Sequence, residues 1–230
     1  MTTASVTRSE RLQNNFLKTL PRVYFALFVL LIFLGIVSPL SVAPSNLVNL
    51  IRQGAALGIV AIGQTIVLIS GGLDLSVGST VILSDVLAAM LISGRESSVA
   101  PVVSLVLVIG TFIGFVNGLL ITRFNVTPFI ATLGMNFIVY GAALVFSGGA
   151  PRGDIPDSMR FWGNGFIGGF FPSAALIWIL VTIVAALMLR RTTFGRQLVA
   201  VGANRLAARL SGVRDQTVTL LAYTFSSLMA

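Results

Sequence analysis

The chain has 230 residues, of which 56% are hydrophobic and only 10% are charged, and its mean hydropathy is +0.97. Soluble domains carry about 25% charged residues, so this composition indicates a protein that folds in lipid. The sequence contains no cysteine and no histidine, which excludes disulfides, thiol nucleophiles, a histidine-dependent triad and the usual zinc and iron sites. The net charge of +8 comes from basic residues at the ends of apolar runs, a pattern typical of membrane proteins rather than of nucleic-acid binding.

The chain begins with a polar segment, residues 1–22, that contains four basic residues. We expect this segment to be cytoplasmic. The apolar run that follows at residues 23–43 is too long for the core of a secretory signal, so it is predicted to be a retained first transmembrane helix. The further apolar runs lie at residues 54–70, 80–93, 102–122, 128–147, 173–189 and 217–230.

The run at residues 217–230 has 14 residues, whereas a membrane-spanning helix needs about 20. We therefore expect a chain truncated at its C-terminus. The predicted fold class is all-α, a polytopic transmembrane helix bundle with six complete spans, the start of a seventh, and a broken segment at residues 71–79.

The predicted orientation rests on two basic segments. Residues 1–22 carry four basic side chains, and the loop at residues 190–216 carries six arginines. If each of the six runs crosses the membrane once, both segments lie on the same side. The positive-inside rule makes that side cytoplasmic.

Glycines recur every four residues in two of the apolar runs. Gly110, Gly114 and Gly118 form two GxxxG steps in register, and Gly54 and Gly58 form another. Such spacing lets two helix backbones approach closely in lipid. We expect the triple to be a helix-packing face.

The sequence ISGGLDLSVGS at residues 69–79 interrupts the apolar pattern with three glycines and an acid. Two interpretations are open. In the first it is a cytoplasmic-side turn in which Asp74 or Ser76 caps the next helix. In the second it re-enters the membrane and lines a passage, since loose backbone at membrane depth must line water or be buried in protein. Asp85, an acid within the next run, could face the bundle interior, a water path or a neighbouring helix.

Three stretches in order resemble a known family. They are IGQTIVLISGGLDLSVGS at residues 62–79, FVNGLLITRFNVTPFIATLGM at 115–135, and TTFGRQLVAVGANRLAARLSGV at 192–213. They are similar to the membrane subunits of bacterial ABC importers for monosaccharides, the ribose-type permeases. The resemblance implies that residues 23–230 form a permease domain in the bacterial inner membrane, with a cytoplasmic coupling loop at 190–216.

The resemblance also implies partners. They are an ATP-binding ABC subunit, a periplasmic substrate-binding protein, a second permease subunit that is identical or different, and membrane lipid. The chain lacks the GxxxxGK[ST] phosphate loop, so ATP is used by the partner subunit. We expect this chain to bind no cofactor, metal or nucleic acid, and to be a transport subunit rather than an enzyme.

Two sets of site residues follow from the matched stretches. The candidates for the transport path are Gly71, Gly72, Asp74, Ser76, Gly78, Asn117, Thr127, Pro128 and Phe129. The candidates for coupling to the ATPase are Gly195, Arg196, Gly202, Asn204, Arg205, Ala207, Ala208, Arg209 and Gly212.

Within the coupling loop, residues 202–210 can form a short helix that places Arg205 and Arg209 on one face and Leu206 and Leu210 on another. An amphipathic helix of this kind suits docking into a groove of a partner. The alternative functions are an ABC permease for branched-chain amino acids or nucleosides, an ion-coupled carrier with Asp74 or Asp85 as its ion site, and a membrane scaffold that transports nothing.

Overall fold

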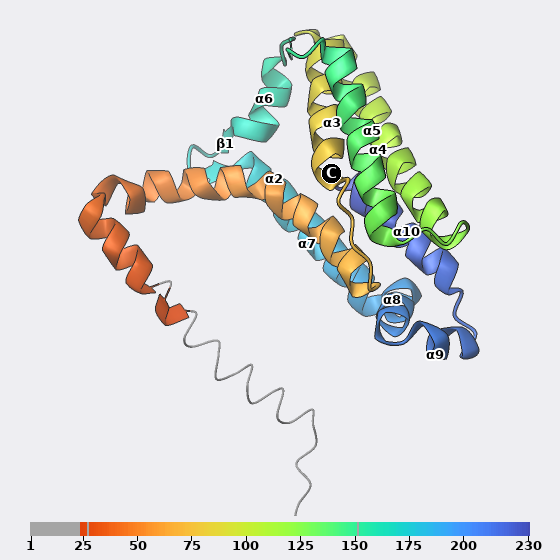
Figure 1. The fold of residues 1–230 in the computed structure, drawn as a ribbon. Helices are drawn as coiled ribbons and strands as arrows, with labels where there is room; N and C mark the ends of the chain where they lie inside the picture. Colours follow the sequence, from red (N-terminus) through yellow and green to blue (C-terminus); the bar gives the residue numbers. More distant parts are fainter. Residues whose placement is uncertain (1–23, 27, 151) are drawn as a thin grey trace, which may run out of the picture. The chain divides into compact units, whose positions relative to one another are not determined.

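A computed structural model of the protein describes residues 24–26, 28–150 and 152–230, which fall into two units divided after Leu50. In the first unit, residues 24–26 and 28–37 are helical. A 3-10 helix, η1 (Pro39–Val42), follows, and then α2 (Pro44–Ile69) begins (Figure 1). The predicted cytoplasmic segment at residues 1–22 lies outside the described residues.

The second unit, from Ile51 onward, consists almost entirely of helices, as predicted. Its longer helices are α2, which continues from the first unit, α3 (Val77–Ile92), α4 (Val99–Thr122), α5 (Pro128–Ser147), α7 (Ser173–Arg191) and α10 (Asp215–Leu228). Its shorter elements are η2 (Glu96–Ser98), α6 (Asp157–Asn164), α8 (Thr193–Ala203), α9 (Arg205–Leu210), and the antiparallel strands β1 (Phe166–Ile167) and β2 (Phe171–Pro172).

Four helices in the described part of the chain are long and apolar enough to cross a membrane. They are α2, α4 (within the stretch Glu96–Thr122), α5 and α7. The predicted count of six complete spans is therefore matched only in part by helix length. The shortfall at α3 has a physical cause. Its 16 residues rise only about 24 Å, because the chain at residues 70–76 is not helical and α3 begins only after it.

Several predicted boundaries were wrong. The helix that contains the second apolar run begins at Pro44 rather than at residue 54. Proline is favoured at the start of a helix, and the helix includes the polar stretch between Pro44 and the apolar run. The region between the apolar runs at 128–147 and 173–189 contains α6 and the hairpin of β1 and β2.

The loops of the second unit meet in two groups. At one end the amide of Gly94, before η2, donates to the carbonyl of Asp154, before α6, at 2.8 Å. At the other end a cavity is lined by residues from α4, α5, α8, α9 and α10 together. The loops before η2 and α6 therefore lie together, and the elements around the cavity form a second group.

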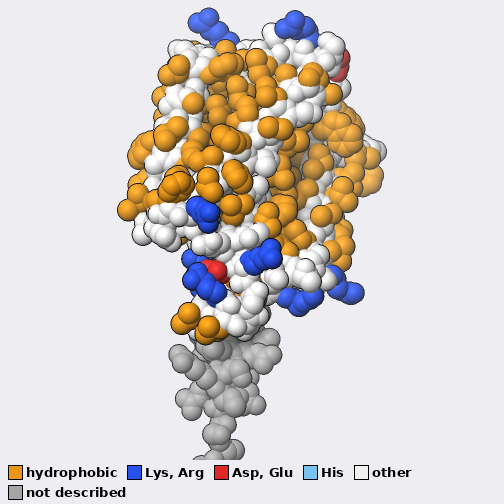
Figure 2. All heavy atoms as spheres, turned by 90° about the vertical axis from the view of Figure 1, so that its right-hand side faces the viewer, with side chains coloured by type: hydrophobic (Ala, Val, Ile, Leu, Met, Phe, Trp, Pro, Cys, Tyr) orange, Lys and Arg blue, Asp and Glu red, His pale blue; other side chains and the backbone are white. Residues whose placement is uncertain are grey.

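The flanks of this unit are apolar. Figure 2 shows hydrophobic side chains covering the visible flank, while arginines and acids gather towards the two ends. Large side chains such as Phe112, Phe137 and Ile138 are mostly exposed. Apolar surface on this scale marks a surface that contacts lipid or protein rather than water.

The glycine triple of α4 is a helix-packing face, as predicted, and the helix that packs against it is α10. A Cβ at Gly110 would come within 2.8 Å of the Ser227 carbonyl oxygen, and one at Gly118 within 2.8 Å of the Leu220 Cα. At Gly114 it would overlap the carbonyl oxygen of Tyr223. The two backbones are thus in direct contact along three turns.

We predict that Gly114→Ala destabilises the protein, because the added methyl group forces α4 and α10 apart at a cost of about 1–3 kcal/mol. Gly134→Ala on α5 is the control, since a Cβ there meets nothing within 4 Å. The measurement is the unfolding midpoint of the detergent-purified protein. Equal midpoints for the two variants would contradict the proposed contact.

Candidate functional site

A non-helical stretch, Ser70–Ser76, separates α2 from α3; we call it the break. Its residues Ser70, Asp74 and Ser76 are buried, while Gly71 and Leu73 are exposed. Gly71 has φ +80°, and its amide donates to Leu68 while that of Gly72 donates to Val67. This pair of bonds around a left-handed glycine is the Schellman arrangement that ends helices. The predicted broken segment at residues 71–79 was therefore too long, since Gly78 lies within α3.

The carboxylate of Asp74 organises the end of the break. Its Oδ1 accepts hydrogen bonds from the Ser76 amide at 3.0 Å and the Ser76 hydroxyl at 2.6 Å. The Ser76 hydroxyl in turn accepts from Nδ2 of Asn117, on α4, at 2.8 Å. Asp74 is 3% exposed and Asn117 is fully buried. The break is thus held to α4 by side chains.

This geometry does not support the part of the first interpretation in which Asp74 or Ser76 caps the following helix. Ser76 occupies the N-cap position of α3, but its side chain makes no capping hydrogen bond there. The Asp74 carboxylate bonds to Ser76 itself rather than to the free amides of α3. Both side chains are also buried, although the turn at Gly71 is exposed.

Leu73 is tied to the bundle through its backbone. The hydroxyl of Tyr223, on α10, accepts from the Leu73 amide at 3.2 Å and lies 3.3 Å from the Leu73 carbonyl, to which it donates. The hydroxyl of Thr132, on α5, lies 3.4 Å from that carbonyl and 2.9 Å from the carbonyl of Pro128, so the two carbonyls share its one proton. These side chains replace the bonds that a helix would make, which a membrane interior requires.

Tyr223 was missed in the sequence analysis. It is fully buried, and a Cβ at Gly72 would overlap its hydroxyl, so that glycine is needed for the approach. A signal was available, because Tyr223, Ser226 and Ser227 follow helical spacing on an otherwise apolar run and place polar groups on one face.

The other transport-path candidates separate into two groups. Gly71, Gly72 and Pro128 line a cavity of about 320 Å³ together with Tyr223 and three coupling candidates, Gly202, Asn204 and Arg205. Thr127 and Phe129 are exposed and lie outside the hydrogen-bond network of the break. Asp85 is on the exposed side of α3.

The coupling candidates form two helices, α8 and α9, which we call the elbow. The Thr192 hydroxyl accepts from the Gly195 amide at the start of α8, and Asn204 Oδ1 accepts from the Ala207 amide at the start of α9 at 3.0 Å. The prediction of one helix over residues 202–210 was wrong, because Asn204 caps a new helix and Gly202 belongs to α8.

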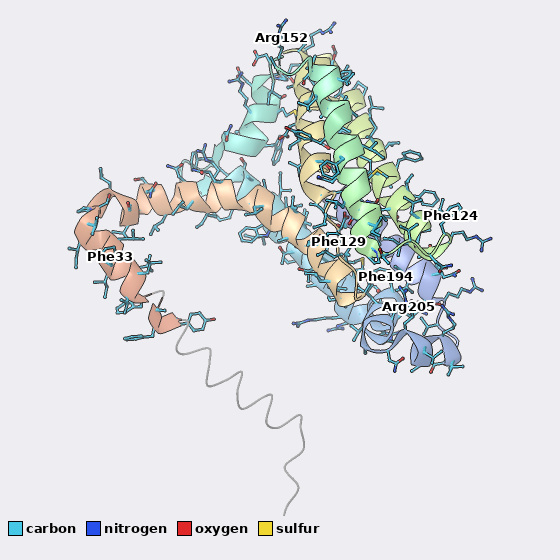
Figure 3. All side chains as sticks on the ribbon, viewed as in Figure 1. Phe33, Phe124, Phe129, Arg152, Phe194 and Arg205 are labelled. Carbon is cyan, nitrogen blue, oxygen red and sulfur yellow. The ribbon has the colours of Figure 1, made fainter. Side chains whose placement is uncertain are left out.

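One acid fixes α9 to α10. Arg209 donates to both carboxylate oxygens of Asp215, at 3.0 and 2.8 Å. Arg205 lies 3.6 Å from the same carboxylate and donates to Thr219 at 2.8 Å. The hydrogen bond from Arg209 holds the pKa of Asp215 below its usual value. Figure 3 shows Arg205 beside α8 and α9, at the end of the second unit where these two helices lie.

Two glycines seat the elbow on the helices above it. A Cβ at Gly195 would overlap the carbonyl oxygen of Leu189, on α7, and one at Gly202 would overlap that of Ile69, the last residue of α2. The elbow therefore contacts the start of the break directly. Of the other coupling candidates, Arg196 and Ala207 are exposed, Ala208 is buried, and Gly212 has φ +84° in the turn after α9.

The described residues contain no group of three or more acidic, histidine or cysteine side chains that could hold a metal ion. The chemistry available at this site is therefore that of buried carboxylate, amide and hydroxyl groups and of the glycine contacts between helices.

Residues 46–230 match the family described as "Branched-chain amino acid transport system / permease component". The chain belongs to this permease family. It is 37% identical over 212 residues to the ribose import permease protein RbsC of Bacillus subtilis, covering 90% of this chain and 64% of that protein. Over 208 residues it is 33% identical to RbsC of Escherichia coli K12, covering 89% and 64% of the two chains.

The chain is also 33% identical over 223 residues to the galactose/methyl galactoside import permease protein MglC of Salmonella typhimurium, covering 90% of this chain and 66% of that protein. It thus spans less than two thirds of the length of each of these curated relatives. No solved structure matches it significantly. The matches confirm the resemblance to sugar-importer permeases, and with the four apolar helices they make the permease a multi-pass membrane protein.

We predict that Tyr223→Phe loosens the break, because the Leu73 amide and carbonyl lose the hydroxyl that both bond to. Leaving a polar group without its hydrogen bond costs about 1–3 kcal/mol. Tyr140→Phe on α5 is the control, since that tyrosine is exposed. Hydrogen exchange of peptides covering residues 70–76 should become faster only in Tyr223→Phe. Unchanged exchange in that variant would show that the hydroxyl does not hold Leu73.

Proposed function

We propose that the chain is the membrane-spanning part of a permease subunit in an ATP-driven importer that moves a monosaccharide into the bacterial cell. The observation that carries the proposal is the family match, combined with relatives named for ribose and for galactose. The family description names branched-chain amino acids, which keeps such a substrate as the second candidate. The names of the relatives favour the sugar.

The proposed topology has six complete crossings and the start of a seventh. In this scheme the break and α3 together make the third crossing, because the non-helical residues 70–76 add length to the short helix. The same scheme makes α10 the start of the seventh crossing, beginning beside the elbow.

The distribution of charged residues between the loops supports an orientation in the bacterial inner membrane with the elbow in the cytoplasm. The loops at the elbow end carry one acid, Asp215, against the basic set Arg123, Arg190, Arg191, Arg196, Arg205, Arg209 and Arg214. At the opposite end the arginines are nearly balanced by the acids Glu96, Asp154 and Asp157. Such asymmetry places the basic loops inside.

The proposed mechanism is alternating access driven from the elbow. An ATPase subunit binds the elbow and uses ATP, a periplasmic binding protein delivers the sugar, and a second permease subunit completes the pathway. Movement of α8 reaches the break through the contact between Gly202 and Ile69. Because packed backbones cannot interpenetrate, displacement of the elbow must displace or release the break.

The elbow offers a suitable docking surface. Leu206 is 66% exposed and Leu210 is 81% exposed, while Arg205 and Arg209 are occupied by Asp215. An apolar pair four residues apart on a short helix fits a hydrophobic groove in the partner. The arginines then orient α9, and the leucines supply the contact area.

The double variant Leu206→Ser, Leu210→Ser should reduce co-purification of the ATPase subunit by at least about ten-fold, because burial of one leucine contributes about 1.5–3 kcal/mol and 1.4 kcal/mol corresponds to ten-fold. Phe170→Ser, in the hairpin at the opposite end, is the matched control, since Phe170 is 74% exposed. Full retention of the ATPase by the double variant would overturn the docking assignment.

The substrate class is tested by uptake into proteoliposomes that contain the complete importer with its binding protein. A panel of labelled ribose, galactose and branched-chain amino acids is offered with and without ATP. ATP-dependent uptake of a monosaccharide is the expected result. Uptake of an amino acid alone would favour the second candidate and contradict the proposal.

A further inference from the structure

Each of four polar side chains near the start of α3 has one buried oxygen atom with no hydrogen-bond partner among the described residues. The atoms are Asp74 Oδ2, Asn117 Oδ1, Ser226 Oγ and Ser227 Oγ. Each of the four residues is at least 97% buried. Burying an unpaired polar group is costly, and burying an unpaired carboxylate more so, so a cluster of them calls for a common partner.

The four side chains come from three elements that meet at this point. Asp74, on the break, is linked through Ser76 to Asn117 on α4. The Cβ of Ser227 lies within 2.8 Å of the position a Cβ would take at Gly114, one turn before Asn117 on α4. The hydroxyl of Ser226 lies beside the Asp74 carboxyl group, near enough for a weak side-chain interaction, but outside the geometry of a formed hydrogen bond.

The chemistry of these atoms selects the partner. A carboxylate oxygen is an acceptor, and so is the amide oxygen of Asn117, whose nitrogen already donates to Ser76. Serine hydroxyls can offer lone pairs as well. An anion is therefore excluded, and the set matches the oxygen ligands that hard cations prefer.

The charge of the cluster sets the charge of the cation. Asp74 is the one acid in the cluster, and the ion pairs found among the described residues do not include it. Calcium sites draw on several carboxylates, whereas a single carboxylate balances one positive charge. Sodium sites in membrane transporters also lie at interrupted helices, where side chains and freed backbone oxygens meet.

We propose that Asp74, Asn117, Ser226 and Ser227 bind a monovalent cation of the size and hardness of Na⁺ at the junction of the break, α4 and α10. The bound ion neutralises the buried carboxylate and joins the break to α10 at a second point beyond Tyr223. It acts on the structure of the break, and the proposal holds whichever substrate the permease carries.

The test is binding of radioactive Na⁺ to the purified full-length permease in detergent, with choline replacing Na⁺ at constant ionic strength. Saturable binding is expected for the wild type, and Asp74→Asn should weaken it by at least about ten-fold, as loss of a ligand does at metal sites. Asp85→Asn is the control, because Asp85 is an acid on the exposed side of α3 and should leave binding unchanged.

Three outcomes would overturn the proposal: no saturable Na⁺ binding by the wild type, full binding by Asp74→Asn, or loss of binding in Asp85→Asn. If Asp74→Asn does not fold, Ser227→Ala decides instead, since it keeps the carboxylate and should weaken Na⁺ binding while the protein stays monodisperse. The assay needs neither sugar nor ATP, so its failure is distinguishable from failure of the proposed transport function.

Discussion

The structure depends on one constraint: backbone amides and carbonyls at membrane depth need partners inside the protein. The break gives up its helical hydrogen bonds and replaces them with side chains from three other helices. Tyr223 satisfies both polar groups of Leu73, Thr132 supports the same carbonyl, and Asn117 holds the Ser76 hydroxyl. An interrupted helix can persist here because α4, α5 and α10 complete it.

α10 joins the parts of the site. At its start, Asp215 binds the two arginines of α9, and in its middle Tyr223 holds the break. Near its end, Ser226 lies beside the Asp74 carboxyl group and Ser227 packs against Gly114 of α4. Its backbone lies directly against the glycine face of α4. A displacement of the elbow would therefore reach the break along two routes, through α10 and through the contact of Gly202 with Ile69.

The sequence allowed prediction of features that depend on local pattern. Apolar runs located the long helices, the glycine spacing located the α4 face, and the three matched stretches identified the family. Features that depend on distant partners could not be predicted. Leu73 and Tyr223 are 150 residues apart, and no local pattern relates them. The division of the elbow at Asn204 was open to prediction, because asparagine is among the best N-cap residues, but the surrounding helix-forming residues favoured one helix.

The central claim is that the polar end of the break, at Asp74 and Ser76, is enclosed by protein. Thiol labelling of single cysteines tests it most directly, since the chain has no cysteine of its own. Ser76→Cys lies at a fully buried position, and Ser211→Cys lies in an exposed turn after α9. In the folded protein a hydrophilic maleimide should label position 211 readily and position 76 only after denaturation. Equal labelling rates at the two positions in the folded protein would contradict the account.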